Sequence, residues 1–344
     1  MMSEFYIIDR GGCGWLRRLG GEGLPVPRGC ERGIALILVL WAVALLTVVA
    51  ASFAFETRTE AMLGANLVDK AKADAAAKAG VLRAVAGLMQ KGDDRWSNDG
   101  AVRSLRFAEA NLRIAAVSEH GKIDLNAAKE DLLLAVVERA IADVADTPEV
   151  TAEEISDAIL DWRDKDHARR PSGAEDGDYR SAGRDSGAAD QAFLSVTELG
   201  QVRGVSAELF DELAGYFTVH TRAARVDPES ASEKVLLAIP GLDAESVNLY
   251  LQARAERDAS EEDKGQRLPT DLLAGGAAYL SKSRPTVYGI LVEARMAGGV
   301  IARRGAVVRV TRNRRRPYTV LALVPESDYA FAALKAPEPT EVAQ

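Results

Sequence analysis

Residues 34–55 read Ile34-Ala-Leu-Ile-Leu-Val-Leu-Trp-Ala-Val-Ala-Leu-Leu-Thr-Val-Val-Ala-Ala-Ser-Phe-Ala-Phe55, a run of 22 residues without a charge. A helix needs about 20 consecutive apolar residues to cross the hydrocarbon core of a bilayer. Arg28 and Arg32 come just before the run, and basic residues beside a span favour the cytoplasmic side. The run therefore predicts a single membrane-spanning helix whose N-terminal end lies in the cytoplasm.

The helical pattern continues after the apolar run. Residues 56–91 contain no proline and are rich in Ala, Leu, Lys and Glu, which favour helix. Apolar residues at Leu63, Leu67 and Leu82 belong to one face of that helix. We expect one helix from Ile34 to about Lys91, stopped by Gly92. A secretory signal has a shorter apolar region of about 7–15 residues, and cleavage near Ser52-Phe-Ala54 stays open as an alternative.

Composition limits the classes of protein that this chain can be. The 344 residues carry a net charge of −8, and a hydrophobic fraction of 47% is enough for a packed core. General nucleic-acid binding usually shows a basic footprint, so no nucleic-acid partner is expected. Both cysteines, Cys13 and Cys30, precede the apolar run. An exported chain that lost them would have no disulfide and would depend on its core or on a metal.

Strand patterns bracket a helical block, which predicts an α+β fold. Short alternating or β-rich runs occur at 105–107, 112–116, 287–296, 306–311 and 318–324. The last three runs are separated by glycine and asparagine turns, as in an antiparallel meander. The expected organisation is a leader at 1–33, a transmembrane half-helix at 34–55, an amphipathic helix with the first strands at 56–118, an α-helical insertion at 119–284, the C-terminal strands at 285–326 and a disordered tail at 327–344.

Two segments of the helical block resemble each other. Gly121-Lys-Ile-Asp-Leu-Asn-Ala and Ala224-Arg-Val-Asp-Pro-Glu-Ser each precede an expected helix, which indicates a duplicated helical unit. Residues 236–243 resemble a helix-hairpin-helix turn, and residues 202–206 are a weaker copy. Such turns bind phosphate in DNA-binding proteins. Asp243 would repel phosphate, so we favour a packing role and keep a DNA-binding module of an uptake system as an alternative.

Six acidic residues within the block form a candidate metal site. They lie between residues 161 and 178, and Gly173 and Gly177 permit tight turns among them. Calcium takes six to eight oxygen ligands, which carboxylates and carbonyls of flexible loops supply. Neighbouring arginines allow the alternative of a solvated ion-pair loop. The candidate ligands are Asp161, Asp164, Asp166, Glu175, Asp176 and Asp178.

The C-terminal strands are strongly basic, with seven arginines between residues 303 and 316. Charged side chains often protect exposed strand edges, and the alternative is a docking surface for an acidic partner. The three histidines, His120, His167 and His220, are scattered, and no nucleophile with a base and an acid can be assembled. We therefore expect no enzyme.

The chain resembles the minor pseudopilin K family of type II secretion systems. The residues that carry the resemblance are Arg32-Gly-Ile-Ala-Leu-Ile-Leu-Val-Leu40, Glu119-His-Gly-Lys-Ile-Asp-Leu-Asn-Ala127, Asp157-Ala-Ile-Leu-Asp-Trp-Arg-Asp-Lys-Asp166, Gly173-Ala-Glu-Asp176, Tyr179, Ser195-Val-Thr-Glu-Leu-Gly-Gln-Val-Arg-Gly204 and Val235-Leu-Leu-Ala-Ile-Pro-Gly241. The resemblance implies a pilin-like fold, in which a long N-terminal helix packs on a small antiparallel sheet and the insertion contains helix-hairpin-helix or SAM-like units.

The resemblance also implies a function. Prepilin peptidase would cut between Gly33 and Ile34, and Ile34 would be N-methylated. The mature chain would join the I and J minor pseudopilins at the tip of the periplasmic pseudopilus, above the major pseudopilin and the inner-membrane assembly platform, and help to export folded proteins. It would bind calcium in the insertion.

One position within the helix distinguishes the tip from the shaft. Counting from Ile34, the fifth residue is Leu38, where most pilins carry a glutamate that pairs with the neighbouring subunit. An unpaired carboxylate in the membrane is costly, and a tip subunit has no neighbour to pair with it. The expected location is the inner membrane, spanned once, with most of the chain in the periplasm. The alternative is a permanently anchored periplasmic calcium-binding protein.

Overall fold

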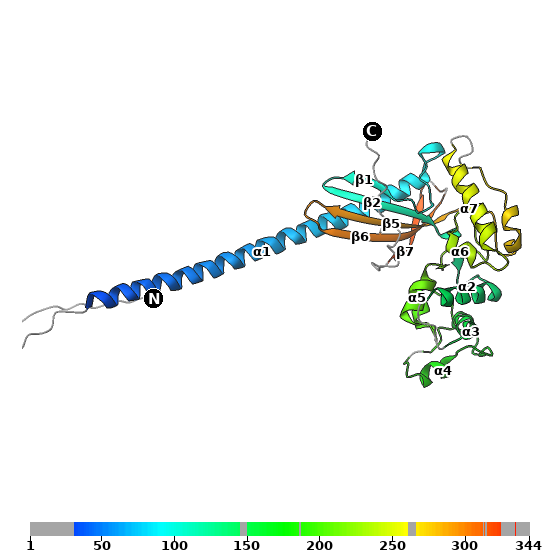
Figure 1. Ribbon diagram of the computed structural model, residues 1–344, viewed down its shortest axis with the longest axis horizontal. Coiled ribbons are helices and arrows are strands. Elements are labelled where there is room, and N and C mark those ends of the chain that lie inside the picture. The colour runs from blue at the N-terminus through cyan, green and yellow to red at the C-terminus, as the bar shows by residue number, and fades with distance from the viewer. Residues whose placement is uncertain are drawn as a thin grey trace, which may run out of the picture. The chain divides into compact units, whose positions relative to one another are not determined.

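The structure is a computed structural model that describes residues 31–144, 150–185, 187–260, 266–311, 313, 315–324 and 334. The chain divides into two compact units, Met1–Leu63 and Gly64–Gln344. Most of the predicted leader, 1–33, lies outside the described residues, as does the predicted tail, 327–344, apart from Leu334. Figure 1 colours the described elements from the N-terminus to the C-terminus.

The long N-terminal helix, α1, spans Glu31–Met89 and confirms the prediction of a single helix through both the apolar and the amphipathic segments. It ends two residues before the expected position, and Gly92 adopts a φ of 64°, which suits a chain turning away from a helix. In the first unit, the described side chains of residues 35–63 are all exposed. A helix with this much exposed apolar surface needs a bilayer or partner helices around it.

In the second unit, α1 packs on the sheet through small side chains. Its buried apolar side chains are Ala73, Ala76, Ala77, Ala84, Val85 and Leu88. An added Cβ at Gly80 would lie only 2.7 Å from Cγ1 of Val292, so glycine is required for the approach at this point. Polar contacts hold the rim of the interface, with Lys72 2.8 Å from Glu109 and Arg304 3.1 Å from Asp74.

The sheet is five-stranded and antiparallel, in the order β1-β2-β5-β6-β7. Its strands are β1 (Arg103–Phe107), β2 (Ala110–Ser118), β5 (Val287–Met296), β6 (Ile301–Val310) and β7 (Tyr318–Val324). The α+β prediction of a long helix on an antiparallel sheet is confirmed. Even-numbered residues of β2 and β5 contact α1, and odd-numbered residues form the outer face, because side chains alternate along a strand.

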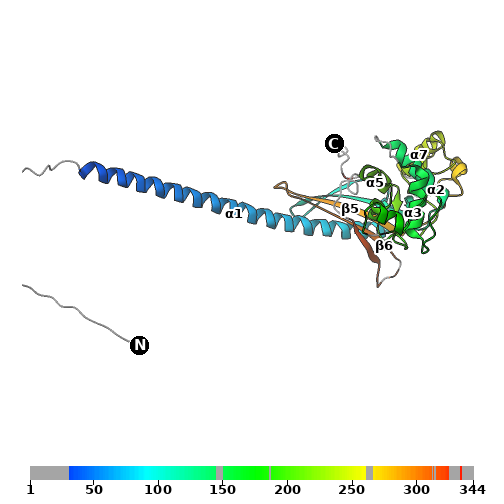
Figure 2. The same ribbon diagram turned by 90° about the horizontal axis from the view of Figure 1, so that it is seen from below.

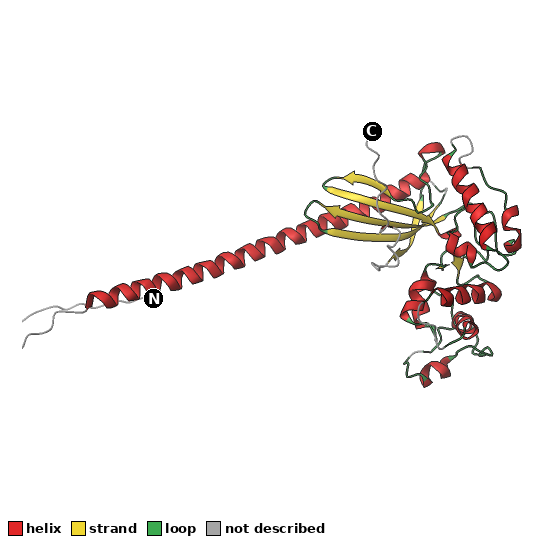
Figure 3. Ribbon diagram, viewed as in Figure 1, coloured by secondary structure: helices red, strands yellow, loops and turns green. Residues whose placement is uncertain are grey.

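The helical block connects β2 to β5, which are neighbours in the sheet. Figure 2 shows its helices beyond one end of the strands, and Figure 3 shows them as a separate group from the sheet. The α-helices are α2 (Glu130–Asp143), α3 (Ala152–Arg163), α4 (Asp176–Ser181), α5 (Ala207–Ala214), α6 (Glu233–Leu237) and α7 (Ala244–Ala259). Short 3-10 helices lie at Gly92–Asp94, Glu119–Gly121, Val196–Gln201 and Asp271–Gly276, and a two-stranded parallel sheet joins β3 (Ile123–Asp124) to β4 (Phe217–Thr218).

The predicted internal duplication corresponds to two equivalent turns. The backbone N–H groups three and four residues after Asp124 donate to its carbonyl oxygen at 3.1 and 2.8 Å. The N–H groups three and four residues after Asp227 donate to its carbonyl oxygen in the same way, at 3.1 Å each. Both carboxyl groups are buried, and each turn leads into a helix, α2 or α6.

The two hairpin turns picked out in the sequence also share a conformation. Gly204 adopts a φ of 86° between the 3-10 helix Val196–Gln201 and α5, and Gly241 adopts a φ of 82° between α6 and α7. An added Cβ at Gly241 would lie 2.5 Å from the carbonyl oxygen of Gly275, so this turn is also tightly covered. Asp243 caps α7 by accepting from the N–H of Ser246 at 2.8 Å, which gives that carboxylate a structural role.

Candidate functional site

The predicted cleavage position lies at the beginning of α1. Gly33 and Ile34 are the third and fourth residues of that helix, and their side chains lie outside the description. Leu38 is 64% exposed. Among the described residues, α1 alone is long and apolar enough to cross a membrane, with a mean hydropathy of 2.7 in its most apolar 18-residue window. None of that window is buried, as expected for a single anchor.

The acidic cluster is built where α3 ends and α4 begins. Asp161 lies in the last turn of α3 and is fully buried, while Asp164 caps the end of that helix. Glu175 caps the beginning of α4 and is 7% exposed. Gly173 is needed between them, because an added Cβ would lie 2.0 Å from Oδ2 of Asp161. The loop thus folds back over a buried carboxyl group.

The loop also brings in two residues that the sequence did not single out as ligands. Ligand atoms of His167, Glu175 and Asp190 all lie within 4.8 Å of one another. Asp190 Oδ2 lies 3.2 Å from Nδ1 of His167. The cluster therefore combines groups from α3, from the loop after it, from α4 and from the segment that follows α4.

Several buried oxygens of this cluster have no hydrogen-bond partner among the described residues. They are both carboxyl oxygens of Glu175, Oδ1 of Asp164 and Oδ1 of Asp190. Buried polar atoms are nearly always satisfied, and leaving one unpaired costs about 1–3 kcal/mol. Unpaired oxygens that converge from separate elements are the arrangement expected around a cation.

The electrostatics of the cluster agree with that geometry. Burial raises the pKa of Asp161, Asp164 and Glu175 above their ordinary values, because removal from water disfavours the charged form. The neighbouring carboxylates raise them further, with Asp164 acting on Asp161 and Asp161 acting on Glu175. A divalent cation would relieve both effects at once.

The six predicted ligands fall into two groups. Asp161, Asp164 and Glu175 are brought together. Asp161 also accepts from the backbone N–H of Arg170 at 3.3 Å, and Nε of Arg170 lies 3.5 Å from its Oδ1. Asp166 is next to Asp164, and one of its oxygens accepts from the N–H of Ala168 at 2.9 Å.

The other two predicted ligands are occupied by arginines. Asp176 forms an ion pair with Arg180 at 2.6 Å, and Asp178 forms one with Arg169 at 3.2 Å. Asp178 also accepts from the backbone N–H of Glu175 at 3.0 Å. Their assignment as metal ligands stays a prediction.

The fold and these sites define a class of protein, an α+β protein in which a membrane-length N-terminal helix lies against an antiparallel sheet interrupted by a helical block. Residues 111–222 match the family model of type II secretion system protein K. That segment begins in β2 of the sheet and ends just after β4 of the helical block. Over this segment the chain is similar to type II secretion system protein K.

Two known proteins are similar to the chain. The type II secretion system protein K of Aeromonas hydrophila is 32% identical over 130 residues, which is 36% of this chain and 39% of that protein. One chain from the crystal structure of the GspK–GspI–GspJ complex of enterotoxigenic Escherichia coli has a TM-score of 0.50 and 17% identity. That alignment covers 79% of this chain and 100% of the other. At this identity the structural match concerns the fold.

Proposed function

We propose that the chain is a minor pseudopilin that starts and caps the pseudopilus of a type II secretion system. The observation that carries the proposal is the family match at residues 111–222, because it joins a strand of the sheet to the helical block in one segment. The exposed apolar half of α1 supports it, since a filament subunit must first be held in the inner membrane and then contact other helices.

Maturation by prepilin peptidase is part of this proposal. Cleavage between Gly33 and Ile34 would leave the apolar helix at the new N-terminus, where Ile34 is methylated. Leu38 would then be the fifth residue, and its lack of charge suits a subunit with no neighbour above it. The bulk of the helical block also suits the tip, since a filament shaft packs its subunits closely on every side.

The partners follow from the same proposal. The matched chain comes from a GspK–GspI–GspJ complex, and we infer that the I and J minor pseudopilins bind this chain. The major pseudopilin and the inner-membrane assembly platform are the further partners. The chain would span the inner membrane once, with its N-terminus in the cytoplasm and most of its residues in the periplasm. Its role is structural, and its helix-hairpin-helix or SAM-like units serve packing.

The N-terminal sequence of the mature chain tests the proposal. In cells with prepilin peptidase, we expect a chain that begins with methylated Ile34, and in cells without the peptidase an uncut leader. Replacing Gly33 with leucine should block cleavage, whereas Gly64→Ala in the same helix should not. Copurification with the I and J subunits completes the test. An uncut chain in the presence of active peptidase would favour a permanently anchored calcium-binding protein, because the acidic cluster does not depend on cleavage.

We further propose that the acidic cluster binds calcium. Asp161, Asp164, Glu175 and Asp190 would hold the ion, which would join α3, α4 and the following segment by neutralising their carboxylates. The unpaired oxygens of Glu175 support this choice. A bound ion stabilises the fold by about 2.7 kcal/mol when its concentration is a hundred times the dissociation constant.

Calorimetry and thermal unfolding of the full chain in a neutral detergent test the calcium site. We expect calcium to raise the midpoint of unfolding and a chelator to reverse the effect. Glu175→Gln should abolish most of the shift, whereas Asp176→Asn should preserve it, because Asp176 pairs with Arg180. No heat of binding and no change with chelator would exclude the site.

A further inference from the structure

The charges of this chain are divided between its parts. Residues 119–284 contain 34 acidic and 19 basic residues, whereas residues 285–324 contain 8 basic residues and one acidic residue. The single acid is Glu293. A chain whose overall charge is −8 therefore carries a strongly basic sheet.

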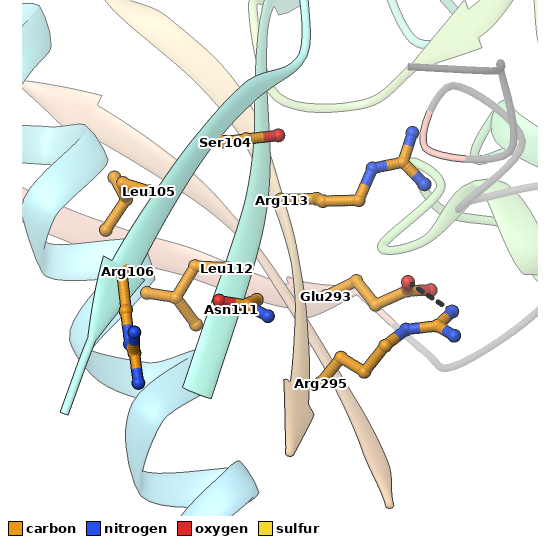
Figure 4. A pocket seen from close by; sticks show the side chains of 8 residues that line it. All are labelled: Ser104, Leu105, Arg106, Asn111, Leu112, Arg113, Glu293 and Arg295. Carbon is orange, nitrogen blue, oxygen red and sulfur yellow. Dashed lines mark hydrogen bonds and ion pairs between the residues drawn. The ribbon is translucent and has the colours of Figure 1, made fainter. Parts of the chain in front are cut away.

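Four arginines gather on the outer face of that sheet, opposite α1. We call Arg106, Arg113, Arg295 and Arg303 the arginine patch. Arg113 lies opposite Glu293 across β2 and β5, and Glu293 lies opposite Arg303 across β5 and β6. In Figure 4, Arg113, Glu293 and Arg295 point to one side of the sheet, away from Leu105 and Leu112.

Glu293 fixes two of these arginines in place. Its side chain is almost fully buried, and its oxygens accept from Nε of Arg303 at 3.0 Å and from a terminal guanidinium nitrogen of Arg295 at 3.4 Å. One carboxylate serves two guanidinium groups, so Arg106, Arg295 and Arg303 together keep a surplus of two positive charges over Glu293. Such guanidinium groups need little further ordering to bind an additional carboxylate.

The patch is also hollowed. A depression of about 370 Å³ is lined by Arg106, Arg113 and Arg295, together with Ser104 and Asn111 (Figure 4). Hydroxyl and amide groups beside guanidinium groups provide hydrogen-bond partners for carboxylates and for the backbone of a bound segment.

Protection of a sheet edge does not account for this arrangement. Charged residues often blunt edge strands, but β2 and β5 are inner strands of this sheet. Arg113 and Arg295 therefore shield no edge. Arg295 places a positive charge on an inner strand, and its side chain is 57% exposed.

We propose that the arginine patch binds an acidic polypeptide segment of a partner protein. The patch extends over β1, β2, β5 and β6, and four neighbouring strands span about 14 Å at 4.8 Å per step. That distance exceeds the size of one phosphate group and suits several carboxylates in a row. The ion pair between Glu293 and Arg303 is the kind of contact that carboxylates of the partner would make with the patch. This proposal stands apart from the assignment of the chain to the pseudopilus tip.

Fluorescence anisotropy with a labelled peptide tests the proposal on the full chain in a neutral detergent. The probe is a peptide of eight glutamates spaced by glycines, and its glutamine counterpart is the reference. We expect the glutamate peptide to bind, the glutamine peptide not to bind, and added salt to weaken the complex. Replacing Arg106 and Arg295 together with alanine should weaken binding about tenfold, since each exposed ion pair contributes up to about 1 kcal/mol.

A matched pair of arginines provides the control. Arg315 and Arg316 are exposed in the turn between β6 and β7, and their replacement by alanine removes the same charge elsewhere. That variant should bind the glutamate peptide within twofold of the unaltered chain. Equal losses in the two double variants would overturn the proposal, because net charge alone would then explain binding. Stronger binding of anionic phospholipid vesicles than of the peptide would also overturn it.

Charge reversal keeps the test decisive. Arg295→Glu places a carboxylate on a half-exposed side chain, so the sheet should still fold. This variant should lose the glutamate peptide more completely than Arg295→Ala does. Unchanged near-ultraviolet circular dichroism in each variant shows that the loss comes from the patch. Retention of the glutamate peptide by Arg295→Glu would overturn the proposal.

Discussion

Replacing Gly87 with alanine should destabilise the second unit by about 2 kcal/mol. Gly87 is buried near the end of α1, and an added Cβ would lie 2.4 Å from Cδ2 of Trp96. The guanidinium groups of Arg83 and Arg103 each lie over the indole ring, 5.0 Å from the ring centroid. The ring must move by more than 1 Å to reach a normal contact distance of about 3.5–4.0 Å.

The magnitude follows from three effects. Overpacking a filled site costs about 1–3 kcal/mol. Each lost cation–π contact at an exposed site costs about 0.5–1 kcal/mol. In the opposite direction, alanine in a helix interior stabilises the helix by about 1 kcal/mol relative to glycine. Urea unfolding of the full chain in a neutral detergent, followed by near-ultraviolet circular dichroism, measures the difference.

Two variants decide whether Trp96 is the cause. Gly64→Ala lies in the same helix with nothing within 4 Å of the added Cβ, so it should stabilise or have no effect. In a Trp96→Ala background, Gly87→Ala should also become neutral or stabilising, because the obstructing ring is gone. The reasoning is refuted if Gly87→Ala has the same stability as Gly64→Ala, or if the Trp96→Ala background leaves the penalty unchanged.

Three further perturbations address the helical block and its connection to the sheet. Asp124→Ala should lower the free energy of unfolding by about 3 kcal/mol, measured with urea. The buried carboxylate accepts from two backbone N–H groups of the segment after β4, at 3.0 and 2.8 Å. A decrease below about 1 kcal/mol would contradict this role. Burial lowers the pKa of His120 and His220, so the unfolded chain binds protons first and stability should fall as the pH drops below about 6.5, by at most about 1.4 kcal/mol per pH unit for each histidine. Glutamine at either position should flatten that pH profile. Gly241→Ala should cost about 2–3 kcal/mol, because its φ is 82° and a carbonyl oxygen covers it; an unchanged urea midpoint would contradict that.

The sequence predicted α1 well because one pattern extends through it without a break. An uncharged run followed by a proline-free segment rich in Ala, Leu, Lys and Glu favours helix throughout. The predicted apolar face was wrong, because Leu63, Leu67 and Leu82 are exposed and the sheet is contacted mainly by alanines. The strands show where such reasoning stops. β6 begins at Ile301, five residues before the expected position. The first part of the strand was missed because Arg303 and Arg304 interrupt the apolar pattern. Arg303 reaches Glu293 on the outer face and Arg304 reaches Asp74 of α1, so both faces of the strand carry charge.

The acidic cluster was predictable only in part. Asp161, Asp164 and Glu175 lie in one acidic run, and their spacing was enough to propose a site. Asp190 comes twelve residues after the last predicted ligand and joins the cluster through the path of the loop, where it adopts a φ of 51°. A loop brings Asp190 close to the end of α3, and no periodic pattern in the sequence predicts such a contact. The two-residue strands β3 and β4 were missed for a similar reason, since so short a pairing has no pattern of its own.

The small-residue face of α1 sets a limit on how far the chain can be shortened. A soluble form that begins at Gly64 keeps all six buried apolar side chains of the helix against the sheet. One that begins after Ala77 loses Ala73, Ala76 and Ala77 and exposes apolar side chains of β2 and β5 to water. The alanines bring the helix close to the sheet, so the space that the missing helix turn would leave is narrow. The first usable start therefore lies between the end of the apolar run and Ala73.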